Sequence, residues 1–382
     1  MTAQPIPAAP DLDLLPSDVE TDLRRSVRAV LAKTCPTEAL VALADGTDDV
    51  SGPAWSGLAH DLGLAALLVP EEHGGAGAGP REAAVVAEEC GRACAPVPFL
   101  TSAVLATSLL VRLGAAEPLA RLAEGGTAAL VVPAGTASAG SWARRTGVEA
   151  SGGGRLTGEV RGVVGLPADL LLVPVHGPDG PALHLVPVDA DGVAVSTRTS
   201  LDATRPVSDV RLDVGAGAPL ATGDEVTAAI DHALATAAGV LAAEQAGLAA
   251  WCLEQTVAHL SERRQFGRVV GGFQALKHRL ADLYAEVGQA SAVAAHAAAA
   301  LAGESDVPVS VAVAQAFCSE VAVHAAEEAV QLHGGLGMTW ESPAHLRLKR
   351  AKADHVLLGS PDAHRDALAR LVDLAAPTPE AG

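Results

Sequence analysis

The stretch ALATAAGVLAAEQAGLAAWCL, from Ala233 to Leu253, is apolar or small on every face that a helix would present, and its only charged residue is Glu244. A helix that is apolar all round is normally buried inside a larger protein. A lone carboxylate in such a helix is costly unless it is paired, protonated or used in chemistry. We therefore expect a long buried helix at the centre of the fold, and Glu244 is its first candidate functional group.

Residues on either side of this stretch suggest where the helix begins and what surrounds it. Thr222 and Glu225 have the spacing of a capping box, so the helix is expected to begin at about Thr222. The apolar run approaches membrane-spanning length, but Glu244 and Gln245 stand at its centre. This favours a buried helix of a soluble protein over a membrane span.

Composition restricts the class of protein. A chain of 382 residues with 49% hydrophobic content can bury a large core, in one domain or several. A net charge of −19 argues against a nucleic-acid partner, because phosphate binding depends on clustered Lys and Arg. The five cysteines are an odd number without zinc or disulfide spacing, and the first residues lack the pattern of a signal peptide. These features indicate reduced thiols and a cytoplasmic location.

The order of sequence patterns predicts an α+β multidomain fold. Residues 17–125 are typical of helices broken by Gly and Pro, and residues 126–221 alternate short apolar runs with turn residues, as β domains do. Residues 222–375 return to long helices. Residues 1–16 and 376–382 are expected to be flexible tails.

Two glycine-containing stretches could bind an anion. Arg263-Arg264-Gln265-Phe266-Gly267 offers two cations and an amide at a helix end, which suits a phosphate or pyrophosphate. The loop from Gln331 to Thr339 has glycines that could expose backbone N–H groups. Taken singly, each stretch is equally typical of a solvated helix end or an ordinary turn.

Together with a third stretch, these motifs resemble the acyl-CoA dehydrogenase family. The matching motifs are Pro70-Glu71-Glu72-x-Gly74-Gly75-x-Gly77, Arg263-x-Gln265-Phe266-Gly267 followed by Gln274, and Gln331-x-x-Gly334-Gly335-x-Gly337. The resemblance covers nearly the whole chain. It implies an N-terminal helical domain, a central β-barrel or sandwich domain and a C-terminal four-helix bundle, with FAD as the cofactor and an acyl-CoA thioester as the substrate.

The resemblance also implies roles for individual residues. Arg263, Gln265, Phe266 and Gln274 resemble residues that reach FAD across a subunit interface. Gln331, Gly334 and Gly335 resemble those that hold the adenine and pyrophosphate side of FAD. A shared site implies a homo- or hetero-oligomer, a dimer or tetramer, whose electrons pass to an electron-transfer flavoprotein or another acceptor.

The chain departs from the family at the catalytic base. In most members a Glu stands 24 residues after the first glycine of the Gly-Gly loop, where this chain has Leu358. The alternative base position in other members falls at Ala237, and the Arg that meets CoA falls near Ala238. The Thr or Ser and the Trp that lie beside the flavin in the β domain are not recognisable between residues 131 and 165.

Glu244 is the remaining candidate base. It stands seven residues after Ala237, on the same helix face and about 10.5 Å further along the axis. The alternative is a structural Glu paired with an Arg or His of a neighbouring helix or subunit, and Asp354 and Glu341 are weaker catalytic candidates.

Three functions remain open. The first is an FAD-dependent acyl-CoA dehydrogenase of a divergent bacterial branch, acting on a bulky or unusual acyl group in lipid or steroid metabolism, alone or within a heteromer. The second is a catalytically inactive subunit that stabilises an active homologue. The third keeps the flavin and performs oxygen-dependent oxidation.

Overall fold

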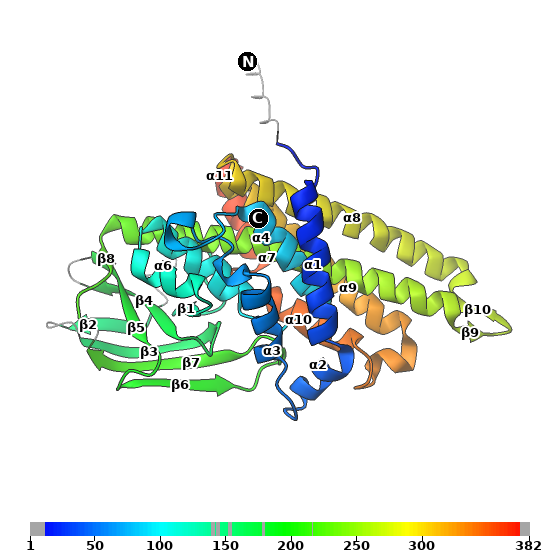
Figure 1. The fold of residues 1–382 in the computed structure, drawn as a ribbon. Helices are drawn as coiled ribbons and strands as arrows, with labels where there is room; N and C mark the ends of the chain where they lie inside the picture. The colour runs from blue at the N-terminus through cyan, green and yellow to red at the C-terminus, as the bar shows by residue number, and fades with distance from the viewer. Residues whose placement is uncertain are drawn as a thin grey trace, which may run out of the picture.

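The computed structural model describes residues 12–138, 142, 146–151, 155–177, 180–215 and 217–374. Helices come first along the chain, two β-sheets follow, and long helices return at the end (Figure 1). The α+β class predicted from the sequence is confirmed. The division of the chain at residues 125/126 and 221/222 stays a prediction, and so does the C-terminal tail, which lies outside the described residues.

The N-terminal helices begin as the sequence indicates. Ser17 accepts a hydrogen bond from the Glu20 amide at 3.1 Å, and the Glu20 carboxylate accepts one from the Ser17 amide at 2.6 Å. This capping box starts α1. The elements of this region are α1 (Asp18–Thr34), α2 (Thr37–Ala44), α3 (Ser51–Ser56), η1 (Gly57–Asp61), η2 (Leu64–Ala66), η3 (Glu71–His73), α4 (Pro80–Ala93), η4 (Phe99–Ala106), α5 (Thr107–Arg112) and α6 (Ala116–Ala123).

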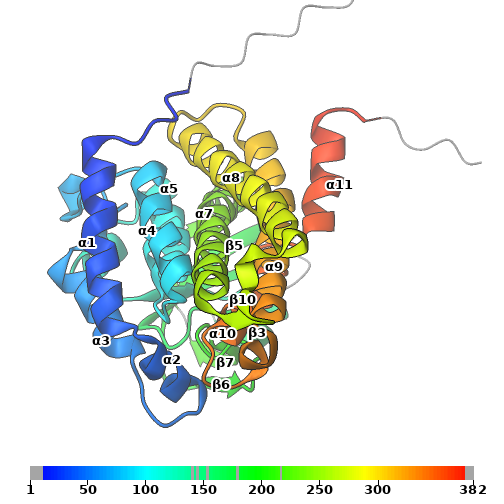
Figure 2. The ribbon, with the colours of Figure 1, turned by 90° about the vertical axis from the view of Figure 1, so that its right-hand side faces the viewer.

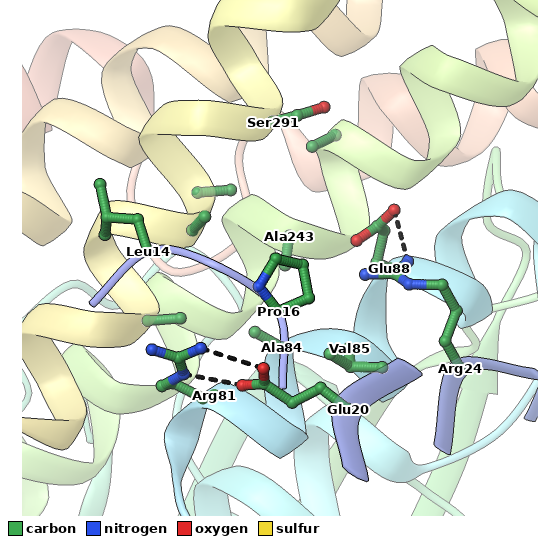
Figure 3. Close-up of a pocket in the computed structure, with 14 residues that line it drawn as sticks. Leu14, Pro16, Glu20, Arg24, Arg81, Ala84, Val85, Glu88, Ala243 and Ser291 are labelled. Atoms are coloured by element: carbon green, nitrogen blue, oxygen red, sulfur yellow. Dashed lines mark hydrogen bonds and ion pairs between the residues drawn. The ribbon is translucent and has the colours of Figure 1, made fainter. Parts of the chain in front are cut away.

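The segment ahead of α1 is held by Arg81 on α4. The Arg81 guanidinium donates to the Leu15 carbonyl at 2.8 Å. It also donates to Glu20 Oε1 at 2.7 Å (Figure 3). Residues 12–16, predicted as part of a flexible tail, are therefore tied to the helices, and residues 1–11 lie outside the described part of the chain.

The central β elements form two four-stranded sheets that enclose an apolar core, which is a sandwich. The strand orders are β1-β4-β5-β8 and β2-β3-β7-β6, with β1 parallel to β4 and the other pairs antiparallel. The strands are β1 (Ala128–Leu130), β2 (Val148–Ser151), β3 (Arg155–Val164), β4 (Leu170–Gly177), β5 (Gly180–Pro187), β6 (Val193–Arg198), β7 (Val207–Gly215) and β8 (Ala221–Thr222).

The long C-terminal helices pack around α7, which contacts α4, α8 and α9 (Figure 2). A short hairpin of β9 (Arg264–Gln265) and β10 (Arg268–Val269) joins α7 to α8 and lies at the far end of the molecule from the sheets (Figure 1). The helical elements are α7 (Asp224–Glu262), η6 (Val270–Gly272), α8 (Gln274–Ala302), α9 (Val307–Leu332), η7 (Gly334–Met338), α10 (Ala344–Asp354) and α11 (Pro361–Leu371).

The predicted capping box at Thr222 does not form, and α7 begins two residues later than expected, at Asp224. Thr222 pairs with Ala182 of β5 and so belongs to the sheet, and the N-cap is Gly223, whose φ of +82° turns the chain into the helix. Sheet pairing therefore outweighs the local capping pattern. The helix itself is buried along most of its length, as expected.

Two glycines bring α7 and α4 into backbone contact. A Cβ on Gly91 would lie 2.0 Å from the Glu244 carbonyl oxygen, and one on Gly247 would lie 2.0 Å from the Glu88 carbonyl oxygen. No side chain fits at these distances, so the two helices cross as closely as backbones allow. This crossing fixes the position of Glu244.

By length and composition, α7 and α9 are apolar enough to cross a membrane. However, 72% of the apolar window of α7 and 67% of that of α9 is buried inside the structure. Both helices have the burial of core helices in a globular fold.

Candidate functional site

A basic pocket lies between the β9–β10 hairpin, the start of α8 and the end of α9. It encloses about 720 Å³, and its lining includes five of the predicted cofactor residues: Arg263, Gln265, Phe266, Gln331 and Gly334. Segments that are far apart in sequence are thus brought together as the motifs predict. Gln274 and Gly335 are not part of this lining; both are exposed next to it, Gln274 as the first residue of α8 and Gly335 beside Gly334 in η7.

The hairpin turn presents an aromatic ring to solvent. Phe266 has a φ of +52° and is 90% exposed. Its ring meets Phe273 edge-on, with centroids 6.2 Å apart, and the Arg268 guanidinium lies 4.5 Å from the Phe273 ring centre. Phe266 thus combines a left-handed backbone, which is uncommon for a non-glycine residue, with a ring whose apolar surface is mostly exposed.

The glycine loop is open on the pocket side. Gly334 has a φ of +64°, and a Cβ added to Gly334 or Gly335 would meet no atom within 4 Å. Beside it, His333 stacks on His259 of α7, with ring centroids 4.3 Å apart. The loop therefore leaves its backbone accessible while a ring pair anchors its start.

The contents of the pocket match a dinucleotide. Arg263 offers a guanidinium for a pyrophosphate, the amides of Gln265 and Gln331 can donate and accept, and Phe266 and Phe273 offer ring faces. All of these polar groups are exposed. The residues present thus fit the adenine and pyrophosphate half of FAD.

Glu244 lies in a different environment, at the centre of a buried charge cluster formed by Asp202, Arg205, Glu244, Arg350 and Asp354. Glu244 is 2% exposed. Both of its oxygens accept from Arg205 Nη2, at 2.6 and 2.7 Å, and Oε1 also accepts from Arg350 Nη1 at 2.7 Å. The cluster joins the β6–β7 loop to α7 and α10.

Arg350 is the most connected member of the buried charge cluster. Its Nε donates to Asp202 Oδ2 at 2.6 Å, and its Nη2 donates to the Thr204 hydroxyl at 2.6 Å and the Thr204 carbonyl at 2.9 Å. Asp202 in turn accepts from the Thr204 amide at 2.8 Å. Both side chains are almost completely buried, so these bonds replace the water that the charges lose.

The two carboxylates that share Arg205 titrate in opposite directions. Burial alone would raise the pKa of Glu244, but Arg205 and Arg350 outweigh it and hold that pKa below its ordinary value. Burial raises the pKa of Asp354 to about 7; the charge of Arg205 opposes this rise, and the negative charge of Glu244 adds to it. Asp354 Oδ1 accepts from Arg205, and Asp354 Oδ2 is buried without a hydrogen-bond partner among the described residues.

This geometry does not suit Glu244 to act as a base. A carboxylate whose oxygens are all engaged by guanidinium groups, and whose pKa is lowered, is a poor proton acceptor. The contacts match the paired structural alternative, with Arg partners in the β6–β7 loop and in α10. We therefore interpret Glu244 as part of the scaffold.

The family's usual base positions hold apolar side chains. Leu358 is buried, and its amide donates to the Ala134 carbonyl at 2.8 Å. A Cβ on Gly359 would lie 3.0 Å from the Ala137 side chain, so this segment packs closely on the β sandwich. Ala237 is fully buried, and the Ala238 carbonyl accepts from Gln315 at 2.5 Å. None of these side chains can take a proton. Glu341 is exposed, as expected of a turn residue.

The sequence did not reveal Arg205 and Arg350 as partners of Glu244, or Asp202 as the second carboxylate on Arg350. The sequence indicated only that Glu244, a carboxylate in a buried helix, needs a cationic partner. Many arginines could have met that need, and the partners lie 39 and 106 residues away in sequence.

Comparisons with known proteins agree with the fold and the motifs. Residues 17–126 match the acyl-CoA dehydrogenase N-terminal domain and residues 227–372 match its C-terminal domain. Acyl-CoA dehydrogenase IpdE2 of Mycolicibacterium smegmatis is 36% identical over 91% of this chain and 96% of its own length.

Two solved structures are similar throughout. The ChsE4-ChsE5 complex from Mycobacterium tuberculosis has a chain that is 26% identical with a TM-score of 0.83, covering 96% of this chain and 100% of that one. The Tcur3481-Tcur3483 steroid acyl-CoA dehydrogenase G363A variant is 29% identical with a TM-score of 0.78, covering 93% and 98%. With its domain matches, its curated relatives and its fold in agreement, this chain belongs to the acyl-CoA dehydrogenase family of FAD-dependent oxidoreductases.

Proposed function

We propose that this chain is one subunit of a heteromeric acyl-CoA dehydrogenase, in which it supplies the adenine and pyrophosphate half of an FAD site shared with an unlike subunit. One observation carries the proposal. The basic pocket keeps its cations, amides and open glycine loop, whereas the usual base positions hold Leu358 and Ala237. The chain has kept the groups that bind and lost the groups that react.

Each residue of the basic pocket has a separate role in binding FAD. Arg263 neutralises pyrophosphate charge, the amides of Gln265 and Gln331 orient the nucleotide, and Gly334 with Gly335 allows its close approach. The exposed Phe266 ring packs against the unlike subunit. When bound there, FAD would supply the acceptor for the hydride that leaves the β-carbon of the acyl-CoA thioester. The base that removes the α-proton comes from the unlike subunit.

The substrate class follows from the relatives. One similar structure is a complex of two differently named chains and another is a steroid enzyme. We infer an acyl-CoA with a bulky, steroid-like acyl group, a cytoplasmic location and an electron-transfer flavoprotein as acceptor. An oxygen-dependent oxidase with the same flavin is distinguished by hydrogen peroxide formed during turnover.

A second candidate is an inactive subunit that stabilises an active homologue without touching its flavin. The apolar residues at the usual base positions, Leu358 and Ala237, favour an inactive subunit as much as they favour a subunit with a shared FAD site. The two functions differ in what they require of the basic pocket, because only a shared FAD site needs Arg263.

The test is co-purification of the tagged chain with its native partner, followed by flavin quantitation from absorbance near 450 nm. We expect bound FAD in the complex, little FAD on the isolated chain, and loss of FAD from the intact complex with Arg263→Ala. Arg25→Ala is the matched control, since Arg25 is exposed on α1 and contacts only Asp22 among the described residues. An Arg263→Ala complex with full FAD would support the stabilising subunit instead. FAD bound tightly by the chain alone would contradict both.

A further inference from the structure

Two stacked histidines join the helix ends that carry the basic pocket. His259 lies in the last turn of α7, and its carbonyl accepts from the Arg263 amide at 3.0 Å. His333 caps the end of α9, lines the basic pocket and directly precedes Gly334. The two ring centroids lie 4.3 Å apart, with 20° between the ring planes. The stack therefore connects the segment that carries Arg263 to the glycine loop.

The glycine loop has few packing contacts where it faces the basic pocket. A Cβ on Gly334 or Gly335 would meet no atom within 4 Å, so the backbone at these two residues is not packed against a neighbour. Gly337 packs on α9 instead, since a Cβ there would stand 2.2 Å from the Val330 carbonyl oxygen. The stack gives the start of the loop a sideways contact with α7, which α9 cannot provide.

The two rings of the stack are held differently. His333 Nδ1 donates to the Ala329 carbonyl at 2.6 Å, which fixes the orientation of the His333 ring. His259 Nε2 is buried and has no hydrogen-bond partner among the described residues. Burial lowers the pKa of His259, nearby His333 and Arg263 add to this shift, and Glu262 opposes it. His259 thus contacts His333 as an uncharged ring.

We propose that His259 is a positioning residue of the FAD site, whose ring holds His333, and with it the glycine loop, at the separation from Arg263 that a bound pyrophosphate needs. The inference rests on the proposed function, because the separation matters only if the basic pocket binds FAD. His259 does not line the pocket and so acts through His333. A loop that is fixed in advance loses less conformational entropy when the ligand binds.

The test measures the affinity for FAD of the co-purified complex, by titrating FAD into complex that has been stripped of flavin. His259→Ala removes the ring and should raise the dissociation constant of FAD about twofold to tenfold, the range for one aromatic pair. His259→Phe keeps a ring without its nitrogens and should restore the affinity of the unaltered complex. A role that needs a charge or a hydrogen bond from His259 would not be rescued by Phe.

Two further variants locate the effect in the stack. His324→Ala is the matched control, since His324 lies on α9, pairs with Glu286 at 2.7 Å and does not line the basic pocket. It should leave the affinity for FAD unchanged. The double variant of His259→Ala with His333→Ala should lose no more affinity than His333→Ala alone, because both substitutions remove the same contact.

Thermal melting of the isolated chain separates positioning from packing in general. If His259→Ala lowers the melting temperature while the complex keeps its affinity for FAD, the ring only packs and the proposal is overturned. A loss of affinity that Phe does not restore, in a variant that circular dichroism shows to be folded, also overturns it. Arg263→Ala distinguishes the two levels of inference. If Arg263→Ala keeps full FAD, the proposed function and this role of His259 both fail. If Arg263→Ala loses FAD and His259→Ala does not, only the role of His259 fails.

Discussion

The two charged regions of α7 differ in how completely their groups are satisfied. At the middle of the helix, Glu244 has every oxygen engaged and is closed to solvent. At its end, Arg263 and Gln265 are exposed around an open pocket. Buried charges that are fully paired with each other stabilise a fold, whereas exposed polar groups around a pocket are free to bind a ligand. We therefore interpret Glu244, the most conspicuous residue of the sequence, as structural, and the exposed end of α7 as the functional candidate.

Removal of Glu244 should have the largest effect. Glu244→Ala leaves the guanidinium groups of Arg205 and Arg350 facing a buried void, and breaking a buried ion pair costs about 3–5 kcal/mol. We expect a loss of this size in the free energy of unfolding, measured by urea denaturation. Arg263→Ala should change stability by less than about 0.5 kcal/mol, as exposed substitutions usually do.

A milder change tests the catalytic alternative for the same residue. In the assembled enzyme, a folded Glu244→Gln variant should exchange the α-proton of bound acyl-CoA at the unaltered rate, because the interpretation gives Glu244 no part in proton transfer. Loss of that exchange in a folded complex would show that Glu244 is the base and would contradict its structural role.

The close crossing of α4 and α7 should give the next largest effect. Gly247→Ala places a Cβ where the Glu88 carbonyl now lies, so the helices must separate, at a cost of about 1–3 kcal/mol. The matched control is Gly288→Ala on α8, where a Cβ meets nothing within 4 Å and removal of a helical glycine should stabilise by about 0.5–1 kcal/mol. Opposite signs in thermal melts would support the crossing; equal signs would contradict it.

Asp354 should make stability depend on pH. Its pKa is raised from 3.8 to about 7 in the folded chain, so the folded state holds a proton that the unfolded state releases between those values. The stability that this proton contributes is complete below the unfolded pKa and is lost as the pH rises to about 7. The slope is at most about 1.4 kcal/mol per pH unit.

The variant Asp354→Asn isolates this contribution. It removes the titration, so the difference in unfolding free energy between the unaltered chain and the variant should fall as pH rises from about 5 to about 7. The buried histidines whose pKa is lowered, such as His364, act in the opposite direction but equally in both proteins. A difference that is flat with pH would show that Asp354 is ionised throughout.

Local patterns were predicted from the sequence, and long-range pairing was not. The capping box at Ser17 and Glu20 forms from local spacing alone, because it needs no other part of the chain. Thr222 and Glu225 have the same spacing but form no capping box, since the Thr222 backbone pairs with Ala182 of β5. The basic pocket was predictable because its motifs are short and specific, and the family and its cofactor followed from them.

The buried charge cluster could not be predicted in the same way. The sequence showed that Glu244 needed a partner, but any of many arginines would have served, and only the packing of α10 and the β6–β7 loop selects Arg350 and Arg205. Where a choice depends on tertiary contacts, propensity carries no information about it.

The smallest expected effect on stability is also the most informative about the exposed end of α7. Phe266→Ala removes a ring that is 90% exposed, so the melting temperature of the isolated chain should be unchanged. If that ring packs against the unlike subunit, the complex should dissociate more readily, by about tenfold or more for an aromatic at the centre of an interface. Tyr284→Ala, at another exposed aromatic on α8, is the control for a general loss of surface apolar area. Sedimentation at several protein concentrations measures the dissociation of the complex for both variants. If Phe266→Ala leaves the dissociation of the complex unchanged, the Phe266 ring of the hairpin does not contact the unlike subunit.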